Sequence, residues 1–224
     1  MFSYVSGWFS DPLSMLRGLV LSLPAVCIGL TVHEWAHAYA AFRLGDPTAR
    51  NLGRLTLNPL AHFDLLGFLC LMLFGYGWAK PVPISPRNFR HYRRDDIIVS
   101  LAGVTMNFLT AFAFLLLTSA LLRLVPSLFG SWAFLLVMDN IVVVNLSLMV
   151  FNLIPLSPLD GSHVLFCLCM RRFLKLCLFL QRYGEYILLA CVLLGLISRV
   201  FTPAVNWFYG WMSEAAWAIV GLFA

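Results

Sequence analysis

Long apolar segments alternate with short polar segments along the chain, and this pattern predicts membrane-spanning helices. The first apolar run covers residues 13–44 and stops before Gly45, a residue type that often ends helices. Further long runs cover residues 95–124, 132–154 and 184–203. A helix needs about 20 mostly apolar residues to cross a bilayer, so each of these four segments is long enough.

Four other segments do not fit a simple crossing. Residues 63–78 are apolar but short and rich in glycine, which suits a re-entrant segment or short hairpin as well as a full crossing. Residues 163–182 are apolar but interrupted by basic residues, and residues 205–224 are rich in Trp and Tyr, so both suit a membrane interface. The alternating sequence GRLTL (53–57) predicts either a short strand or a plain loop hairpin.

Composition agrees with this reading of the pattern. Of the 224 residues, 61% are hydrophobic and 11% are charged, and the mean hydropathy is +0.88; soluble domains carry about 25% charged residues. We predict an all-α polytopic membrane protein with four to six transmembrane helices. It forms a single membrane-embedded domain over 1–224, with a core at about 13–165 and C-terminal helices at about 184–224.

Positive charge orients the predicted helices. Twelve of the 15 basic residues fall in three groups, at 43–54, 80–94 and 171–182. Basic loops stay in the cytoplasm, so the runs at 13–44 and 132–154 both end on the cytoplasmic side. This topology accounts for the formal net charge of +5. We therefore expect the protein to interact with a lipid bilayer and not with nucleic acid.

The segment LTVHEWAHAYAAF (30–42) places two histidines and a carboxylate near the end of the first apolar run. His33 and His37 are four residues apart, so they lie on one face of a helix and can bind one metal ion. Glu34 lies beside that face and can act as general base on a water at the metal. Composition alone produces this spacing in roughly one chain in 700. We therefore predict a zinc site, which needs a third protein ligand.

The third ligand must reach the same depth as the two histidines. The candidates are Asp46, Asp64, Asp139, Asp160, His62, His91 and His163. Asp160 is favoured because the run at 132–154 brings it to the cytoplasmic side, and because two prolines and Gly161 break the helix there. Broken backbone at membrane depth is tolerated mainly where it lines a cavity. His163, three residues later, is the rival.

At this point the residues resemble the site-2 protease family of intramembrane zinc metalloproteases. His33-Glu34-Trp35-Ala36-His37 matches the family's HExxH helix. The second family signature is an Asn, then a Pro, then Leu-Asp-Gly eight residues after the Asn, and it is matched by Asn152, Pro155, Leu159, Asp160 and Gly161. The segments GDPTARNLGRLTLNPLAHFD, GWAKPVPISPRNFR and AGVTMNF also resemble the short branch of this family. The likeness covers most of the chain to about residue 165.

The resemblance implies a function and a set of site residues. His33, His37 and Asp160 are expected to bind one zinc ion, and Glu34 is expected to be the catalytic base. Asn152 is expected near the metal, where it helps to hold the substrate or the developing oxyanion. The implied activity is hydrolysis of a peptide bond within or near a transmembrane segment of a membrane protein substrate. The expected location is the bacterial inner (plasma) membrane, with the active site towards the cytoplasmic side.

The chain departs from the family pattern before Asn107. The family often has Ala-Gly-Pro there, whereas this chain has Ala102-Gly103-Val104, which leaves the local helix geometry open. For Asn107 itself, an interhelical hydrogen bond and a role near the site are both open. No PDZ or CBS domain fits in the chain, so substrate selection is absent or supplied by a partner, such as an adaptor protein or a second copy.

Three other functions compete with this interpretation. A metal-binding membrane transporter would need polar residues along several spans, whereas here they concentrate at one depth. A di-iron membrane oxygenase needs several histidine boxes, and this chain has five histidines and one box. A catalytically inactive family member that binds membrane proteins would keep the metal ligands, but the intact Glu34 argues against it.

Overall fold

The computed structural model describes residues 11–74 and 77–222, and within these two ranges it contains helices and no strand. The outermost parts of the predicted domain, residues 1–10 and 223–224, lie outside the described residues, as do residues 75–76 of the predicted segment 63–78. The all-α fold predicted from the apolar runs is confirmed.

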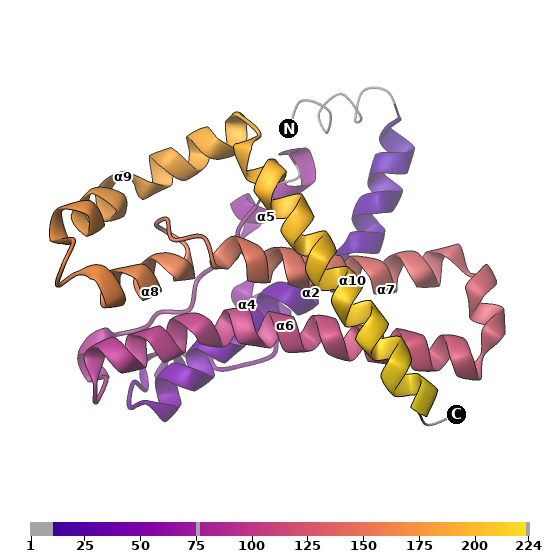
Figure 1. Cartoon of the computed structure of the whole chain (residues 1–224), viewed down its shortest axis with the longest axis horizontal. Coiled ribbons are helices and arrows are strands. Elements are labelled where there is room, and N and C mark those ends of the chain that lie inside the picture. Colours follow the sequence, from indigo (N-terminus) through magenta and orange to yellow (C-terminus); the bar gives the residue numbers. More distant parts are fainter. Residues whose placement is uncertain (1–10, 75–76, 223–224) are drawn as a thin grey trace.

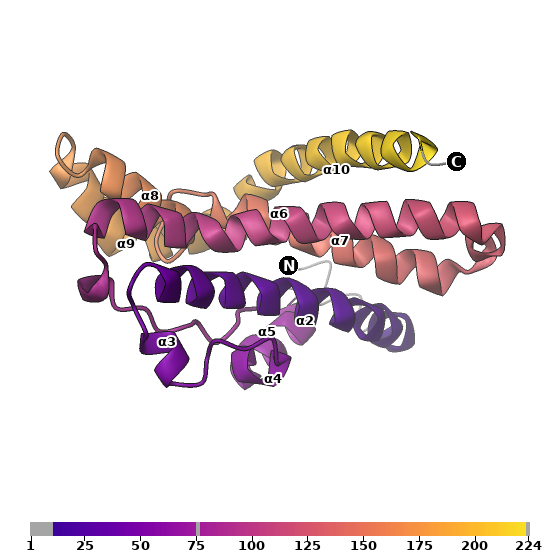
Figure 2. The same ribbon diagram turned by 90° about the horizontal axis from the view of Figure 1, so that it is seen from below.

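Three long helices form the centre of the molecule (Figure 1). They are α2 (Pro12–Arg43), α6 (Tyr92–Leu124) and α7 (Trp132–Asn152), and each packs against the other two. The short helix η2 (Pro126–Gly130) turns the chain between α6 and α7. The predicted helices at 13–44, 95–124 and 132–154 are thereby confirmed. Both α2 and α7 run towards the end of the molecule at which α6 begins (Figure 2).

Both ends of α2 follow from local sequence. Asp11 caps the N-terminus, where its side chain accepts a 3.1 Å hydrogen bond from the backbone N–H of Ser14, and Pro12 fits the first turn because its missing N–H has no helical partner there. The helix ends at Arg43, and Gly45 then adopts φ +109°, a conformation that residues with a side chain rarely reach. This is the helix end predicted from the sequence.

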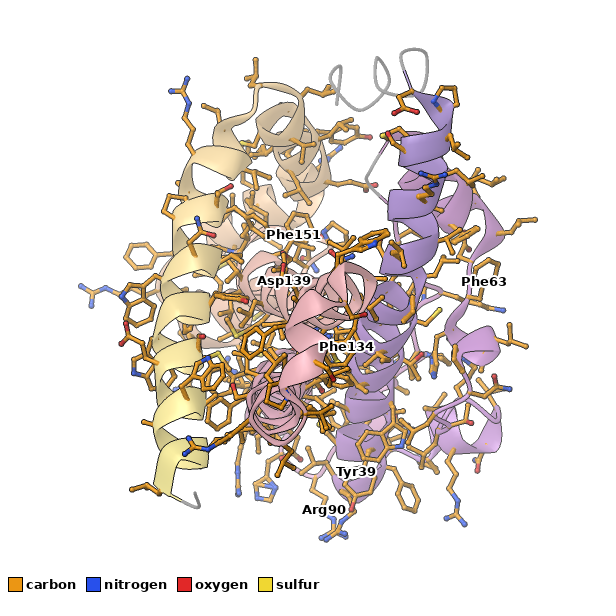
Figure 3. All side chains as sticks on the ribbon, turned by 90° about the vertical axis from the view of Figure 1, so that its right-hand side faces the viewer. Tyr39, Phe63, Arg90, Phe134, Asp139 and Phe151 are labelled. Carbon is orange, nitrogen blue, oxygen red and sulfur yellow. The ribbon has the colours of Figure 1, made fainter. Side chains whose placement is uncertain are left out.

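The main apolar core lies between α6, α7 and α10 (Leu196–Leu222). Its buried residues are Val104, Ala111, Leu115, Val142, Leu146, Met149, Val205, Met212 and Ala216. The helices form layers in which α6 and α7 lie between α10 on one side and α2 on the other (Figures 2 and 3). The site helix α2 is therefore held from one side by the α6–α7 hairpin.

The connection between α2 and α6 folds back along α2. It contains α3 (Thr48–Asn51), α4 (Pro59–His62), α5 (Leu65–Phe74) and η1 (Pro86–Asn88). Asp46, fully buried, ties the connection together: its carboxylate accepts 2.7 Å hydrogen bonds from the backbone N–H of Ser85 and from Nδ2 of Asn88, and a further bond from the hydroxyl of Thr48. Burial alone raises the pKa of Asp46, but these hydrogen bonds outweigh it and lower the pKa below its ordinary value.

The interpretation of GRLTL (53–57) as a strand is wrong. These residues follow α3 as turns and bends. The backbone N–H of Arg54 donates to the carbonyl of Ala49, and the carbonyl of Thr56 accepts from His62 Nε2 at 2.9 Å. Because local partners take these backbone groups, they are not available for a second strand, and the alternative of a plain loop is the one observed.

The segment 63–78 is too short to cross a membrane. Its helix α5 has ten residues, which rise about 15 Å, roughly half of the hydrocarbon thickness. A Cβ on Gly67 of α5 would lie only 2.1 Å from the backbone oxygen of Trp78. Trp78 therefore packs against α5, which means that the chain doubles back after this helix. The re-entrant or hairpin interpretation fits this geometry, and a full crossing does not.

The C-terminal boundaries differ from the prediction. The predicted segments 163–182, 184–203 and 205–224 are replaced by α8 (Asp160–Cys169), α9 (Leu174–Leu193) and α10. Gly195 breaks the predicted span at 184–203, because its φ of +68° turns the chain between α9 and α10. Hydropathy is nearly uniform across this break, so the apolar pattern alone did not reveal it.

Four helices of the described ranges are long and apolar enough to cross a membrane: α2, α6, α7 and α9. This number agrees with the lower limit of the four to six predicted. The fourth candidate is α9, which begins ten residues before the span predicted at 184–203.

Candidate active site

The two histidines of the HExxH motif lie one turn apart on the face of α2 that packs against α6. His33 and His37 are 5% and 6% exposed, and their Nε2 atoms are 2.9 Å apart. Residues four apart on a helix share a face, so the helix itself sets this pairing. The rings meet edge to face, with an interplanar angle of 84°, and both nitrogens thereby point to one place.

Asp160 comes to the same place from the other end of the fold. It is the first residue of α8, and its Oδ2 lies 3.2 Å from Nε2 of each histidine. Gly161 permits this approach, because a Cβ there would lie 2.5 Å from the carbonyl oxygen of Leu153 and 2.7 Å from that of Ile154. Only a glycine lets the start of α8 pack so closely on the end of α7. The motif Leu-Asp-Gly thus combines a ligand with the glycine that places it.

The three atoms fit a zinc ion. They are 2.9, 3.2 and 3.2 Å apart. These distances are close to the separation of about 3.3 Å between ligand atoms that lie 2.0–2.1 Å from a tetrahedral zinc. Nδ1 of His37 lies 2.8 Å from the carbonyl oxygen of Val99; as donor to it, the ring keeps its lone pair on Nε2. Two imidazole nitrogens and a carboxylate oxygen that converge in this way can hold a cation, and within the described residues this is the group of His, Cys, Asp or Glu side chains with that geometry.

Gly103 of α6 lies directly against both histidine rings. A Cβ at this position would lie 2.6 Å from Cε1 of His33, 2.6 Å from Nε2 of His37 and 2.7 Å from Nδ1 of His33. No side chain fits there without moving the rings. The valine that follows in this chain, Val104, is part of the apolar core and leaves α6 a continuous helix. The departure from the family pattern therefore leaves the metal site intact.

Glu34 lies beside this group and has its own partner. Its Oε2 accepts a 2.8 Å hydrogen bond from the backbone N–H of Val82. Val82 belongs to an extended segment that runs along α2 and is held by two further bonds: the N–H of Lys80 donates to the carbonyl of His62 at 2.9 Å, and Nη2 of Arg54 donates to the carbonyl of Lys80 at 2.7 Å. Sequence analysis missed this contact with Glu34, because nothing in the local pattern indicates which backbone group faces it.

The other candidate ligands lie in other parts of the structure. His163 points to Asp96 of α6, with 3.4 Å between its Nδ1 and the carboxylate, and this carboxylate raises the pKa of His163, although partial burial lowers it. His62 bonds to Thr56, and Asp139 accepts a 2.7 Å hydrogen bond from the hydroxyl of Tyr209. The remaining candidates cap or join loops: Asp46 as described, Asp64 through the N–H of Gly67, and His91 as the residue before α6.

Asn152 is the last residue of α7, eight residues before Asp160. Its Nδ2 donates a 3.0 Å hydrogen bond to the carbonyl of Leu148 in the same helix. Among the described residues, Asn152 makes no hydrogen bond to His33, His37 or Asp160. Its expected role near the metal therefore stays a prediction.

A cavity of about 730 Å³ lies beside α2. Its lining is mainly apolar and comes from α2, α4, α5, α7, the Trp78 region and the α9–α10 region. Phe63 and Phe151, labelled in Figure 3, belong to it. Leu23, Cys27 and Leu30 line it from α2. These residues and Glu34 are spaced by four, three and four positions, so they share one helix face. The cavity therefore follows the face of α2 that leads to Glu34.

The chain is similar to curated proteins over most of its length. It is 34% identical over 206 residues to the "Putative zinc metalloprotease YwhC" of Bacillus subtilis (strain 168), a match that covers 87% of this chain and 89% of the relative. The chain belongs to the site-2 protease family of zinc metalloproteases. It is also 27% identical over 213 residues to the "Putative zinc metalloprotease Rip2" of Mycolicibacterium smegmatis, covering 93% of this chain and 80% of the relative.

A third relative is the protein of the same name from Mycobacterium tuberculosis (strain ATCC 25618 / H37Rv), with 31% identity over 168 residues, 73% of this chain and 62% of the relative. No protein-family model matches the chain, and no solved structure matches it. Family membership and the four apolar helices identify an integral membrane protein whose metal is zinc.

Proposed function

We propose that this family member is a zinc-dependent intramembrane endopeptidase, which hydrolyses a peptide bond within or near a transmembrane segment of a membrane protein. The observation that carries the proposal is that Asp160 of α8 meets His33 and His37 of α2, a helix long enough to span the membrane. Peptide hydrolysis at such a depth needs a metal site, a base and a place for an apolar substrate, and the chain has candidates for all three.

His33, His37 and Asp160 are the proposed zinc ligands. Two imidazoles and one carboxylate would hold the ion and leave access for water or substrate, as in other catalytic zinc sites. When bound, zinc supplies a Lewis acid that lowers the pKa of a water molecule and polarises the scissile carbonyl group. The carbonyl of Val99 holds His37 in its orientation through Nδ1.

Glu34 is the proposed general base. It directly follows the first ligand, His33, so its carboxylate lies about 100° around the helix from that ligand, beside the metal position without occupying it. Glu34 takes a proton from the attacking water and later gives it to the leaving amine. The N–H of Val82 holds Oε2 in place at 2.8 Å, which limits the carboxylate to few orientations before substrate binds.

Asn152 is the proposed donor to the substrate carbonyl oxygen. An asparagine amide carries two N–H donors, and the bond to Leu148 uses one of them. The second is left for an oxygen that gains negative charge during attack, which is the kind of contact that stabilises an oxyanion.

The proposed substrate segment occupies the cavity beside α2. Its apolar lining suits a segment that comes from lipid, and the helix face of Leu23, Cys27 and Leu30 leads it to Glu34. The carbonyls of a helix are bonded within the helix, so the substrate must unwind near the scissile bond. Helix-breaking residues in the substrate therefore favour cleavage.

The proposed location is the bacterial inner (plasma) membrane, with the active site towards the cytoplasm. Glu34 lies nine residues before Arg43, the end of α2, which corresponds to about 14 Å along the helix. The basic groups at 43–54 and 80–94 follow α2 and precede α6 at that same end of the fold (Figure 2). Basic residues favour the cytoplasmic side, so water reaches the site from there.

The test compares three proteins purified in detergent: the wild type, Glu34→Gln and Asp160→Ala. Each is assayed for zinc content and for cleavage of a single-span reporter substrate. We expect wild-type cleavage, zinc without cleavage for Glu34→Gln, and loss of both for Asp160→Ala. Equal cleavage by Glu34→Gln and the wild type would remove Glu34 from its role. A wild type that binds zinc and the reporter but cleaves nothing would favour the inactive, binding-only alternative.

A further inference from the structure

Several buried polar atoms near the metal group have no hydrogen-bond partner among the described residues. Asn107 of α6 is fully buried, yet neither Oδ1 nor Nδ2 of its amide is bonded. Asn145 of α7 is also fully buried; its Nδ2 donates to the carbonyl of Ile141, but its Oδ1 has no donor. The third group is Nδ1 of His33. Buried polar groups without partners are rare, because each loses its hydrogen bonds to water on burial.

These atoms come from three helices that meet at one place. Asn107 follows Gly103 by four residues and so lies on the same side of α6, and Gly103 is in direct contact with Nδ1 of His33. Gly29 precedes His33 by four residues on α2, and a Cβ on it would lie 3.5 Å from Nδ2 of Asn145. The two asparagines thus face α2 about one turn deeper in the fold than the histidines.

The two histidines differ in how their outer ring nitrogens are satisfied. Nδ1 of His37 is 2.8 Å from the carbonyl of Val99, whereas Nδ1 of His33 has no partner. Histidines that bind metal almost always donate their other N–H, because that bond sets the tautomer and the ring orientation. His33 therefore lacks an acceptor, and the amide oxygen of Asn107, which is also unsatisfied, lies on the side of α6 that adjoins the His33 ring.

We propose that Asn107 positions His33 through a buried water that Asn145 also holds. The N–H at Nδ1 of His33 donates to the water, and the water donates to the amide oxygens of the two asparagines. Buried waters typically make about three hydrogen bonds to such groups. Asn107 is then a positioning residue for the metal centre, and it resolves the choice between a plain interhelical contact and a role near the site in favour of the latter.

The inference rests on the proposed zinc ligands, and its test separates the two. The full chain in detergent is prepared as the wild type and as His33→Ala, Asn107→Leu, Asn107→Asp and Thr110→Val. Thr110 is the matched control because it is a buried polar residue of α6 almost one turn further from Gly103. For each protein, zinc affinity is measured by competition with a chelator, and the unfolding temperature is measured without zinc.

We expect Asn107→Leu to weaken zinc binding by about 10- to 100-fold, with an unfolding temperature of the zinc-free protein that is equal to the wild type or higher. The reason is that leucine removes the amide oxygen that holds the water accepting from His33, but also removes a buried amide whose Nδ2 has no acceptor. Asn107→Asp keeps an acceptor oxygen and should keep zinc affinity within about threefold, well inside the 10- to 100-fold range of a lost outer-shell partner. Thr110→Val should match the wild type.

Wild-type zinc affinity for Asn107→Leu would overturn the inference, and so would weaker binding that is accompanied by an equal loss of stability without zinc. If Asn107→Leu fails to fold, Asn107→Asp decides: an affinity well below that of the wild type overturns the inference. His33→Ala provides the separation. Wild-type affinity there refutes the ligand set, whereas a loss there combined with unchanged Asn107→Leu refutes the role of Asn107 alone.

Discussion

Replacement of Gly103 by alanine should disable the metal site although it adds only a single methyl group. The added Cβ would lie 2.6–2.7 Å from three ring atoms of His33 and His37, whereas ordinary contacts of a Cβ begin near 3.4 Å. Either the rings or α6 must therefore retreat by about 0.8 Å. The added carbon is bonded directly to the helix backbone, so no side-chain rotation can move it away. Movement of α6 gives no escape, because it would stretch the 2.8 Å contact between His37 and Val99.

The expected size follows from the tolerance of zinc coordination. Distances from zinc to its ligands are kept within about 0.2 Å, so a shift of this size removes at least one imidazole from the ion. Four-ligand zinc sites are worth about 10–16 kcal/mol, or about 3 kcal/mol for each ligand. That loss corresponds to a zinc affinity lower by on the order of 100-fold.

The assay is chelator competition on the purified chain, with the unfolding temperature measured in parallel. Gly18→Ala is the matched control, because Gly18 lies in α2 with nothing within 4 Å of its Cβ position. In that helix alanine should leave zinc affinity unchanged and stabilise the protein by up to about 1 kcal/mol. Zinc affinity of Gly103→Ala equal to that of Gly18→Ala would refute the packing argument.

Two further changes test the groups around the site. Val82→Pro removes the N–H that holds Glu34, so cleavage of the reporter should fall by at least about tenfold while the zinc content stays unchanged. Val82→Ala keeps the N–H and serves as the control. Equal cleavage rates for the two variants would count against the contact. Because hydrogen bonds lower the pKa of Asp46, its carboxylate stabilises the fold at neutral pH, and this contribution is lost as the pH falls below the ordinary value of 3.8. Asp46→Asn should therefore cost about 2 kcal/mol at pH 7 and progressively less towards pH 3, as followed by thermal unfolding at each pH; a gap that does not narrow would contradict the role of the charge.

Much of the candidate site was predictable because its signals are local. The spacing of His33 and His37 needs only helix geometry, and Gly161 next to Asp160 marks a close approach of backbone. Gly103 was not singled out as a site residue, although a glycine within a long helix costs about 0.5–1 kcal/mol relative to alanine and can therefore indicate close packing. The sequence did not reveal that its packing partner is the pair of histidines on α2.

The errors lie where local backbone hydrogen bonds and turns override the apolar pattern. GRLTL alternates like a strand, but its neighbours in space are turns and a histidine that satisfy its backbone. The segment at 184–203 is as apolar as a span, but the positive φ of Gly195 divides it. Neither decision is encoded in hydropathy, because local hydrogen bonds and the backbone angle of a glycine do not change how apolar a segment is.

By itself, the sequence determined the membrane class of the protein, its three central helices and the identity of the candidate ligands. Periodicity, length and residue chemistry act over a few residues, so these properties can be read locally. Tertiary structure alone decided that Asp160 meets the two histidines at 3.2 Å, that Val82 holds Glu34, and that unsatisfied asparagines lie behind His33. Those contacts join residues 48 to 127 positions apart, and only the packing of α2, α6, α7 and α8 brings them within hydrogen-bonding distance.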